Sequence, residues 1–278
     1  MRIDAHHHLW RYDPASFGWI DPNGAIARDF LLADLVAAQQ DAGIDACIAV
    51  QARQMPAETT FLLECAAASP RIVGVVGWID LRAADIVDAI DTAAHPAIVG
   101  YRHVVQDEAD PHFLVQDAFV RGVKAVAARG LTYDLLVDHA QLADVPALLD
   151  RIDGGRFVLD HAAKPAIVAG GWQPWADRIA AVAACPQVWC KVSGLVTEAD
   201  HDAWTPDQIE RYLDHVLALF GPERLIWGSD WPVCLLAASY RQVVDLVEDF
   251  VARRCPEARE AIFGDNAVRA YALRMESS

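Results

Sequence analysis

The stretch Ile3-Asp4-Ala5-His6-His7-His8-Leu9-Trp10 opens the chain as an apolar, strand-like segment that ends in three histidines. Side chains along a strand alternate between its faces, so His6 and His8 lie on one face and His7 on the other. Two imidazoles on one face can hold one metal ion or polarise one oxygen. Because the histidines sit inside a strand-like segment, an expression tag does not explain them. The stretch predicts a first strand that ends in a functional site.

Length and composition favour one large folded domain. The chain has 278 residues, of which 54% are hydrophobic and 22% charged, which suits an α/β barrel of ordinary size. The net charge of −16 and the lack of clustered Lys and Arg argue against a nucleic-acid partner. No run reaches the roughly 18 uncharged apolar residues of a membrane span. The cysteines show no metal-ligand spacing and are expected to be reduced, so we expect a soluble, cytoplasmic protein without a membrane partner.

Eight short apolar runs alternate with stretches of helical period rich in Ala, Leu and Val. The strand-like runs are 3–8, 46–52, 72–81, 97–105, 131–137, 157–161, 188–195 and 225–230. The helical stretches are 31–42, 58–68, 84–93, 117–128, 142–152, 175–184, 205–220 and 240–253. This alternation predicts an α/β fold, a (β/α)8 TIM barrel that forms a single domain over 1–278. A doubly wound open sheet is the alternative, but no GxGxxG turn follows the first strand.

The segment 11–28, between the first strand and the first helix, is long and contains Tyr12, Phe17 and Trp19 among several turn-forming residues. Long loops at the ends of barrel strands often form lids or pocket walls. We therefore expect a lid-like loop over about 11–28.

Polar side chains are concentrated at the C-terminal ends of the predicted strands, where the active site of a (β/α)8 barrel lies. They are His6, His8, Gln51, Arg53, Arg102, His103, Asp138, His139, Asp160, His161, Lys164, Lys191, Ser193, Ser229 and Asp230. The strand interiors are expected to carry few such groups. This asymmetry is typical of an enzyme, since a purely structural barrel does not need it.

Each of these residues also has a structural interpretation. Asp230 could cap a helix, although the Trp-Pro that follows is not typical of a helix start, so a carboxylate in the barrel mouth is favoured. His161 could be a buried histidine paired with Asp160, and Arg102 could form a surface ion pair, but both follow apolar strands and are expected in the site. The functional and structural interpretations are evenly balanced for His139, Lys191 and Arg53.

Four motifs, taken together, carry a resemblance to a known family. They are Ile-Asp-Ala-His-x-His-Leu-Trp at 3–10, Gly100-Tyr101-Arg102, Leu159-Asp160-His161-x-x-Lys164-Pro165 and Gly228-Ser229-Asp230-Trp231-Pro232. In this order, at strand ends, they resemble the amidohydrolase superfamily and, within it, the amidohydrolase-related sugar lactonases. The resemblance covers essentially the whole chain. It implies a hydrolase that opens a sugar lactone, such as L-fuconolactone or L-rhamnonolactone, to the aldonic acid.

The resemblance also implies roles for particular residues. His6 and His8 form the strand-one pair, His161 is the strand-six histidine and Asp230 is the strand-eight base. Strand four offers Arg102 in place of an acidic metal ligand, so a binuclear centre is not expected. The implied cofactor is one zinc ion on His6, His8 and Asp230, and a metal-free mechanism stays open.

In the mechanism that we expect, Asp230 takes a proton from water and returns it to the ring oxygen of the lactone, while His161 orients the water or Asp230. His6, His8 and Arg102 stabilise the oxyanion. The expected substrate-binding residues are Gln51, Arg53, Trp19, Tyr101, Lys164 and Trp231. Two alternatives remain, a metal-dependent decarboxylase of aromatic acids and a non-catalytic sugar-binding barrel. The sugar, its ring size and the number of subunits stay open.

Overall fold

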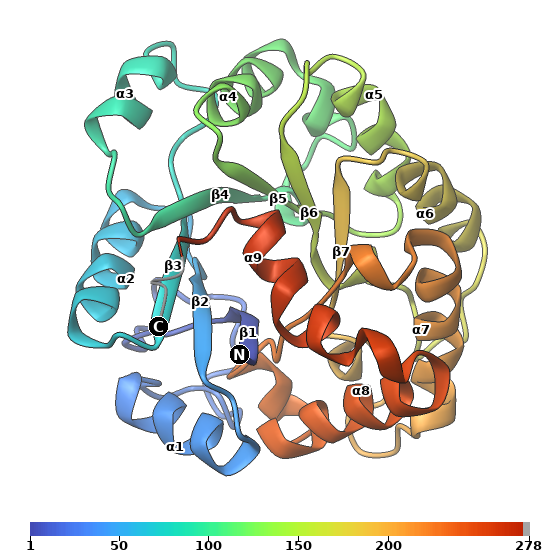
Figure 1. Cartoon of the computed structure of the whole chain (residues 1–278). Coiled ribbons are helices and arrows are strands. Elements are labelled where there is room, and N and C mark those ends of the chain that lie inside the picture. Colours follow the sequence, from blue (N-terminus) through green and yellow to red (C-terminus); the bar gives the residue numbers. More distant parts are fainter. Residues whose placement is uncertain (275–278) are drawn as a thin grey trace.

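The computed structural model describes residues 1–274, and its eight strands form one parallel sheet in the order β1 to β8. The strands are β1 (Ile3–His7), β2 (Ala46–Val50), β3 (Ile72–Gly77), β4 (Ile98–Val104), β5 (Thr132–Leu136), β6 (Arg156–Leu159), β7 (Val188–Val192) and β8 (Leu225–Trp227). A parallel bridge between His7 and Trp231 joins β1 to the segment after β8. The predicted (β/α)8 barrel is therefore confirmed (Figure 1).

Helices surround the strands (Figure 1). They are α1 (Leu32–Ala42), α2 (Pro56–Ala68), α3 (Ile86–Thr92), α4 (Asp117–Ala128), α5 (Val145–Leu149), α6 (Trp175–Ala183), α7 (Pro206–Phe220), α8 (Tyr240–Arg254) and α9 (Asn266–Ala270). Helix α7 begins with proline at its first position, where the missing N–H costs no hydrogen bond. Among the described residues no helix combines the length and the apolar character needed to cross a membrane.

The strands end one to four residues earlier than the sequence predicts. The clearest cases are His161 and Asp230, whose φ values of 52° and 56° are left-handed and cannot continue a strand. The predicted strand ends at 161 and 230 were therefore wrong. These residues belong to turns that bend over the mouth of the barrel.

The interior of the barrel is filled by small and branched side chains and is closed at one end by the C-terminal segment. The strands contribute Ile3, Ala5, Ala46, Ile48, Val50, Val76, Val158 and Ile226, and the C-terminal segment contributes Ala267, Ala270, Tyr271 and Leu273. Helix α9 crosses the end of the barrel that faces the viewer in Figure 1. The hydroxyl of Thr132 donates to the carbonyl of Ala270 at 2.7 Å and ties this helix to β5.

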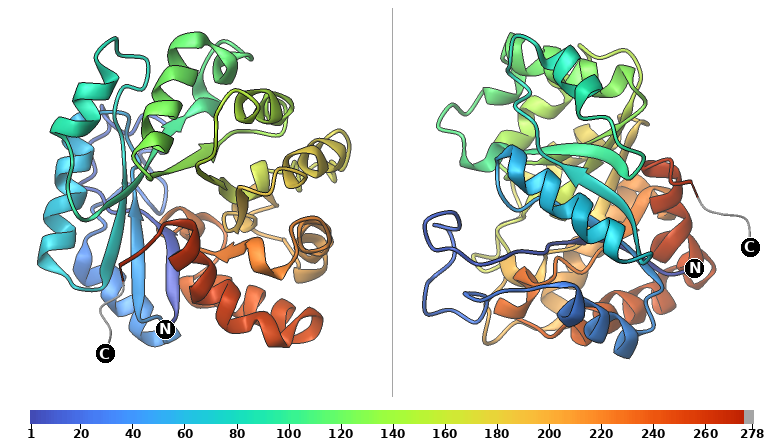
Figure 2. Two further views of the ribbon diagram at one scale, coloured as in Figure 1. Left: turned by 45° about the horizontal axis from the view of Figure 1, so that its top comes forward. Right: turned by 90° about the vertical axis from the view of Figure 1, so that its left-hand side faces the viewer.

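The segment 11–28 lies at the opposite end from α9 (Figure 2, right). Its base is apolar: the Trp10 ring packs against Phe17 and Phe30 at centroid distances of 5.5 and 5.7 Å. The indole N–H of Trp10 donates to the carbonyl of Arg28 at 2.8 Å and joins the two ends of the loop. Trp19 is 51% exposed near its tip. The loop therefore has a fixed base and an exposed aromatic tip beside the barrel mouth.

Candidate active site

A bulge in β1 directs two histidines into the barrel mouth. The register of β1 against β2 shifts between Asp4 and His7. His8 donates through Nδ1 to the carbonyl of Val50 at 2.8 Å, which leaves its Nε2 facing the mouth. The Nε2 atoms of His6 and His8 lie 3.3 Å apart. The first strand therefore presents a pair of ring nitrogens to one point.

His161 enters the mouth on a left-handed turn that follows β6. Residues 161 to 164 all have positive φ, between 48° and 57°. Such a conformation costs roughly 1–2 kcal/mol for each residue with a side chain, and strain of this kind concentrates at functional sites. His161 and Lys164, at the two ends of this turn, line the same cavity. The indole of Trp175 holds the turn by donating to the carbonyl of Ala162 at 2.8 Å.

Asp230 places a carboxylate among these imidazoles. Its Oδ1 lies 3.4 Å from Nε2 of His8, 3.7 Å from Nε2 of His6 and 3.9 Å from Nε2 of His161. Its backbone N–H donates to the carbonyl of His6 at 2.8 Å, which fixes the left-handed residue in place. The carboxylate caps no helix, so the capping interpretation is wrong.

The electrostatics favour an ionised aspartate beside neutral histidines. Burial alone would raise the pKa of Asp230, but attraction to His161 and the hydrogen bond with His8 more than offset it, so the pKa lies below 3.8. Burial lowers the pKa of His161 to about 4. It also lowers the pKa of His6 well below 6.5, and the positive charge of Lys191 adds to the effect. The carboxylate is therefore ready to accept a proton at neutral pH.

Arg102 is held rigidly at the edge of the site and is not a surface ion pair, since only 3% of it is exposed. Its Nη1 donates to Asp160 at 2.9 Å and lies 3.2 Å from Nε2 of His6. Its Nη2 donates to the carbonyl of Gln51. Burial alone would raise the pKa of Asp160, but Lys191, His6 and Arg102 more than offset it and hold this pKa well below 3.8. The guanidinium is thus fixed before any ligand arrives.

Lys191 lies beneath the site, fully buried. Its Nζ is 2.6 Å from Asp134, 3.0 Å from Asp160 and 3.1 Å from Nδ1 of His6. The hydroxyl of Tyr271 also donates to Asp134, at 2.7 Å. The expectation that strand interiors carry few polar groups was therefore wrong for this layer of the barrel.

Like Asp134, Asp4 is a buried acidic residue that the sequence analysis did not identify as part of the site. Its carboxylate accepts from the backbone N–H of Ser229 at 2.9 Å, the hydroxyl of Ser229 at 2.6 Å and the hydroxyl of Tyr240 at 3.0 Å. These bonds fasten β1 to the segment that carries Asp230. The sequence did contain a signal for this role, because Asp4 is an acidic residue in the middle of an otherwise apolar strand.

A cavity of about 360 Å³ opens above these groups. The predicted residues His8, Trp19, Arg53, Arg102, His161, Lys164 and Asp230 line it. Two cations at its rim are each paired with a carboxylate: Arg53 with Glu58 at 2.8 Å, and Lys164 with Glu198 at 3.5 Å. The volume suits one small molecule.

Three predicted substrate-binding residues lie elsewhere. Gln51 is fully buried and its amide donates to the carbonyl of Arg102 at 3.3 Å. Tyr101 points away from Arg102 along β4 and lines a separate cleft beside α3. Trp231 is buried, with its ring centroid 5.1 Å from that of Phe30. The structure places these three side chains outside the lining of the cavity, because the sequence does not indicate how deep a side chain lies or which side of the barrel wall it faces.

His139 also lies outside the cavity, in a neighbouring depression that it shares with Lys164 and Glu198.

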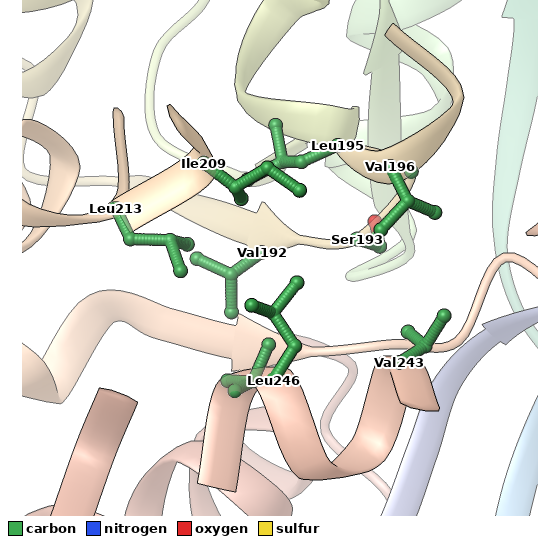
Figure 3. A pocket seen from close by; sticks show the side chains of 10 residues that line it. Val192, Ser193, Leu195, Val196, Ile209, Leu213, Val243 and Leu246 are labelled. Carbon is green, nitrogen blue, oxygen red and sulfur yellow. The ribbon is translucent and has the colours of Figure 1, made fainter. Parts of the chain in front are cut away.

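A further pocket lies behind the site, between β7 and the helices α7 and α8, where Val192, Leu213 and Leu246 converge (Figure 3). Its volume of about 10 Å³ is close to the room that one water needs, so it is a packing gap.

The residues present fit one divalent metal ion. His6, His161 and Asp230 each offer a ligand atom, and these atoms lie within 4.8 Å of one another. The structure thus groups His161 with the predicted ligands His6 and Asp230, whereas the predicted ligand His8 is not in this group, although its Nε2 lies 3.4 Å from Asp230. Neutral imidazoles with a carboxylate are a typical zinc donor set. The second ring nitrogen of His161 is held by the hydroxyl of Ser193 at 2.9 Å, as is usual for histidine ligands.

Named proteins with similar sequences are lactonases. The chain is 45% identical to the L-fucono-1,5-lactonase of Burkholderia multivorans, over 98% of this chain and 96% of that protein. It is 36% identical to the L-fucono-1,5-lactonase of Burkholderia ambifaria over the same shares. A crystal structure of an amidohydrolase from Burkholderia multivorans with bound zinc superimposes with a TM-score of 0.95 at 44% identity, covering 99% of this chain and 100% of that one.

A family model described as amidohydrolase matches residues 3–273, which include every group at the barrel mouth. The chain therefore belongs to the amidohydrolase family.

Proposed function

We propose that this enzyme hydrolyses a sugar lactone, such as L-fucono-1,5-lactone, to the aldonic acid. The observation that carries the proposal is the 45% identity to an L-fucono-1,5-lactonase over nearly the whole chain. The more distant similarity to an L-rhamnono-gamma-lactonase of Scheffersomyces stipitis, 23% identical over 63% of this chain and 59% of that protein, points to the same bond type. In this proposal the chain forms one catalytic domain and 11–28 is its lid.

Asp230 is the general base of the proposed reaction. Its carboxylate takes a proton from water, and the oxygen of that water attacks the lactone carbonyl. The bond between the carbonyl carbon and the ring oxygen then breaks. The proton passes from Asp230 to the ring oxygen, so one lactone and one water give one hydroxy acid. His161, oriented by Ser193, holds the water and the carboxylate in line.

The developing negative charge on the carbonyl oxygen needs donors that are already fixed, since such donors need no reorganisation during the reaction. Arg102 meets this requirement, because Asp160 and the carbonyl of Gln51 hold its guanidinium. The ring hydroxyls would hydrogen-bond to Arg53 and Lys164 at the rim, and Trp19 would cover the apolar face of the sugar.

One zinc ion would be held by His6, His161 and Asp230, whose ligand atoms lie within 4.8 Å of one another, with His8 beside them at 3.4 Å from Asp230. A zinc ion is bound in the similar Burkholderia multivorans structure. When bound, such an ion polarises a carbonyl and lowers the pKa of a coordinated water.

The free thiols at all six cysteines agree with a cytoplasmic enzyme.

The test is a panel of aldonolactones assayed with a pH indicator, with the spontaneous hydrolysis rate subtracted, before and after treatment with a chelator. We expect acid release from L-fucono-1,5-lactone well above the spontaneous rate. Release of carbon dioxide from aromatic carboxylates, with no lactone turnover by zinc-loaded protein, would refute the proposal and favour the decarboxylase alternative.

A further inference from the structure

The loop between β2 and α2 places two polar side chains, Arg53 and Gln54, on the wall of the cavity. Each of them is tied to the protein along one edge. The Nε of Arg53 donates to the carboxylate of Glu58 at 2.8 Å. The backbone N–H of Val104 donates to Oε1 of Gln54 at 3.0 Å. Within residues 1–274, Nη1 and Nη2 of Arg53 and Nε2 of Gln54 have no hydrogen-bond partner, so three nitrogen atoms stay free for a ligand.

These free atoms are all hydrogen-bond donors. A guanidinium has N–H groups and no acceptor, so the terminal N–H groups of Arg53 remain once Nε is used. A backbone N–H can only donate, so the atom of Gln54 that faces Val104 is the amide oxygen, and the NH2 group is left over. The wall formed by Arg53 and Gln54 therefore offers donors alone and complements ligand atoms that accept, such as hydroxyl oxygens.

Glu58 fixes the direction of the Arg53 guanidinium. Its side chain is fully buried, and its second oxygen accepts from the backbone N–H of Ala52 at 2.9 Å. It lies in the first turn of α2, where the helix dipole favours a carboxylate. The guanidinium carbon of Arg53 also lies 5.0 Å from the ring centroid of Phe17, in the 11–28 loop. Arg53 is therefore held from α2 and from the 11–28 loop before a ligand arrives, which lowers the entropy cost of binding.

We propose that Arg53 and Gln54 make the enzyme specific for hydroxylated lactone rings, and that Glu58 is the positioning residue that directs Arg53 at two neighbouring ring hydroxyls. The inference rests on the proposed function. Arg102 and Asp230, whose side chains are 4% and 6% exposed, lie at the depth where the reacting carbonyl would bind. Arg53 is 19% exposed and lies nearer the opening, so it meets the substituents of the ring. Two parallel N–H groups fit two neighbouring oxygens, which the point charge of a lysine does not match.

The first test measures selectivity, the ratio of kcat/KM for L-fucono-1,5-lactone to kcat/KM for δ-valerolactone, which has the same ring and no hydroxyl. Glu58→Gln keeps an oxygen for the N–H of Ala52 but turns an N–H toward Nε of Arg53 and so releases the guanidinium. We expect selectivity to fall about 10- to 100-fold, mainly through a higher KM for the sugar lactone, because a hydrogen bond to a charged group contributes this much to affinity. Unchanged selectivity would overturn the proposal. The control is Glu64→Gln, the same change at an exposed position of α2, which should keep selectivity within about twofold of wild type.

The second test shows whether Glu58 acts through Arg53. In an Arg53→Met background, Glu58→Gln should change selectivity by less than about twofold, since the guanidinium that Glu58 directs is gone. An equal loss in both backgrounds would make Glu58 a support of the loop alone and would overturn the proposal.

A third variant, Arg53→Lys, keeps a cation beside the buried Glu58 and should fold as the wild-type protein does by circular dichroism. It lacks the two parallel donors, so we expect it to lose about tenfold in selectivity. Full selectivity in Arg53→Lys contradicts the inference. A wild-type protein that hydrolyses neither lactone refutes the proposed function and this inference with it. Equal losses in the two backgrounds, in a protein that does hydrolyse lactones, refute this inference alone.

Discussion

Gly194, two residues after the end of β7, should be intolerant of any side chain. A Cβ atom at this position would lie 2.6 Å from Nδ1 of His161 and 3.1 Å from Oδ2 of Asp230. Its φ of +64° is left-handed, so a substituted residue is also strained. The smallest change, Gly194→Ala, therefore presses a methyl group against both the proposed base Asp230 and His161, which orients it.

The size of the effect follows from these distances. Ordinary contact begins at 3.4 Å, so His161 would have to retreat by about 0.8 Å, the difference between 3.4 and 2.6 Å. A displacement near 1 Å of a reacting group can cost about 100-fold in rate, which is about 2.7 kcal/mol of activation free energy. The left-handed backbone adds about 1–2 kcal/mol of lost folding stability. We expect a loss of about 100-fold in kcat/KM for L-fucono-1,5-lactone.

The control is Gly154→Ala, in the loop before β6 at the far end of the barrel. Gly154 has a similar φ, +73°, and no atom lies within 4 Å of its Cβ position. The Gly154→Ala variant should lose about as much folding stability as Gly194→Ala and keep its activity. Both variants are compared by kcat/KM and by chemical unfolding. If Gly194→Ala keeps kcat/KM within about threefold of wild type, the close approach to His161 is not limiting and the reasoning fails.

Three further predictions concern the proposed chemistry. Asp230→Asn should fold normally by circular dichroism and lose on the order of 1000-fold in kcat, because the amide cannot accept the proton of water; near-normal turnover would exclude Asp230 as the base. Because the pKa of Asp230 lies below 3.8 and that of His161 is about 4, kcat/KM should stay flat from pH 7 to pH 5 and fall only as the pH approaches 4; an acid limb centred near pH 6.5 would assign the proton transfer to another group. Trp19→Ala should raise KM about fivefold with little change in kcat, since stacking contributes about 1 kcal/mol to binding in ground and transition states alike; a fall in kcat alone would exclude that role.

The fold and the central residues could be predicted because they follow a strong rule. Parallel barrel strands bring their C-terminal ends together, so histidines and acids at those ends converge. His6, His8, His161 and Asp230 do converge around one point, although Asp230 arrives by a left-handed turn and not by strand alternation.

The substrate-binding residues could not all be predicted, because they depend on side-chain direction beyond the strand. Arg53 and Gln51 lie two residues apart, yet Arg53 lines the cavity and Gln51 is buried behind Arg102. Trp19 and Trp231 are both tryptophans near the mouth, and only Trp19 reaches the cavity. Whether a side chain at the mouth reaches the cavity depends on how the surrounding loops pack, which the sequence pattern does not indicate.

The charged layer beneath the mouth needs an explanation other than stability. A buried ion pair seldom stabilises a fold more than well-packed apolar side chains would, because both charges lose their hydration. The barrel contains that apolar alternative in its own interior, where Ile48, Val76 and Val158 pack. Lys191 and Asp134 instead occupy the layer that touches His6, and Asp160 links this layer to Arg102. Charges occur where a histidine and a guanidinium must be held in one orientation, so the cost of burying them is best explained by the chemistry at the mouth.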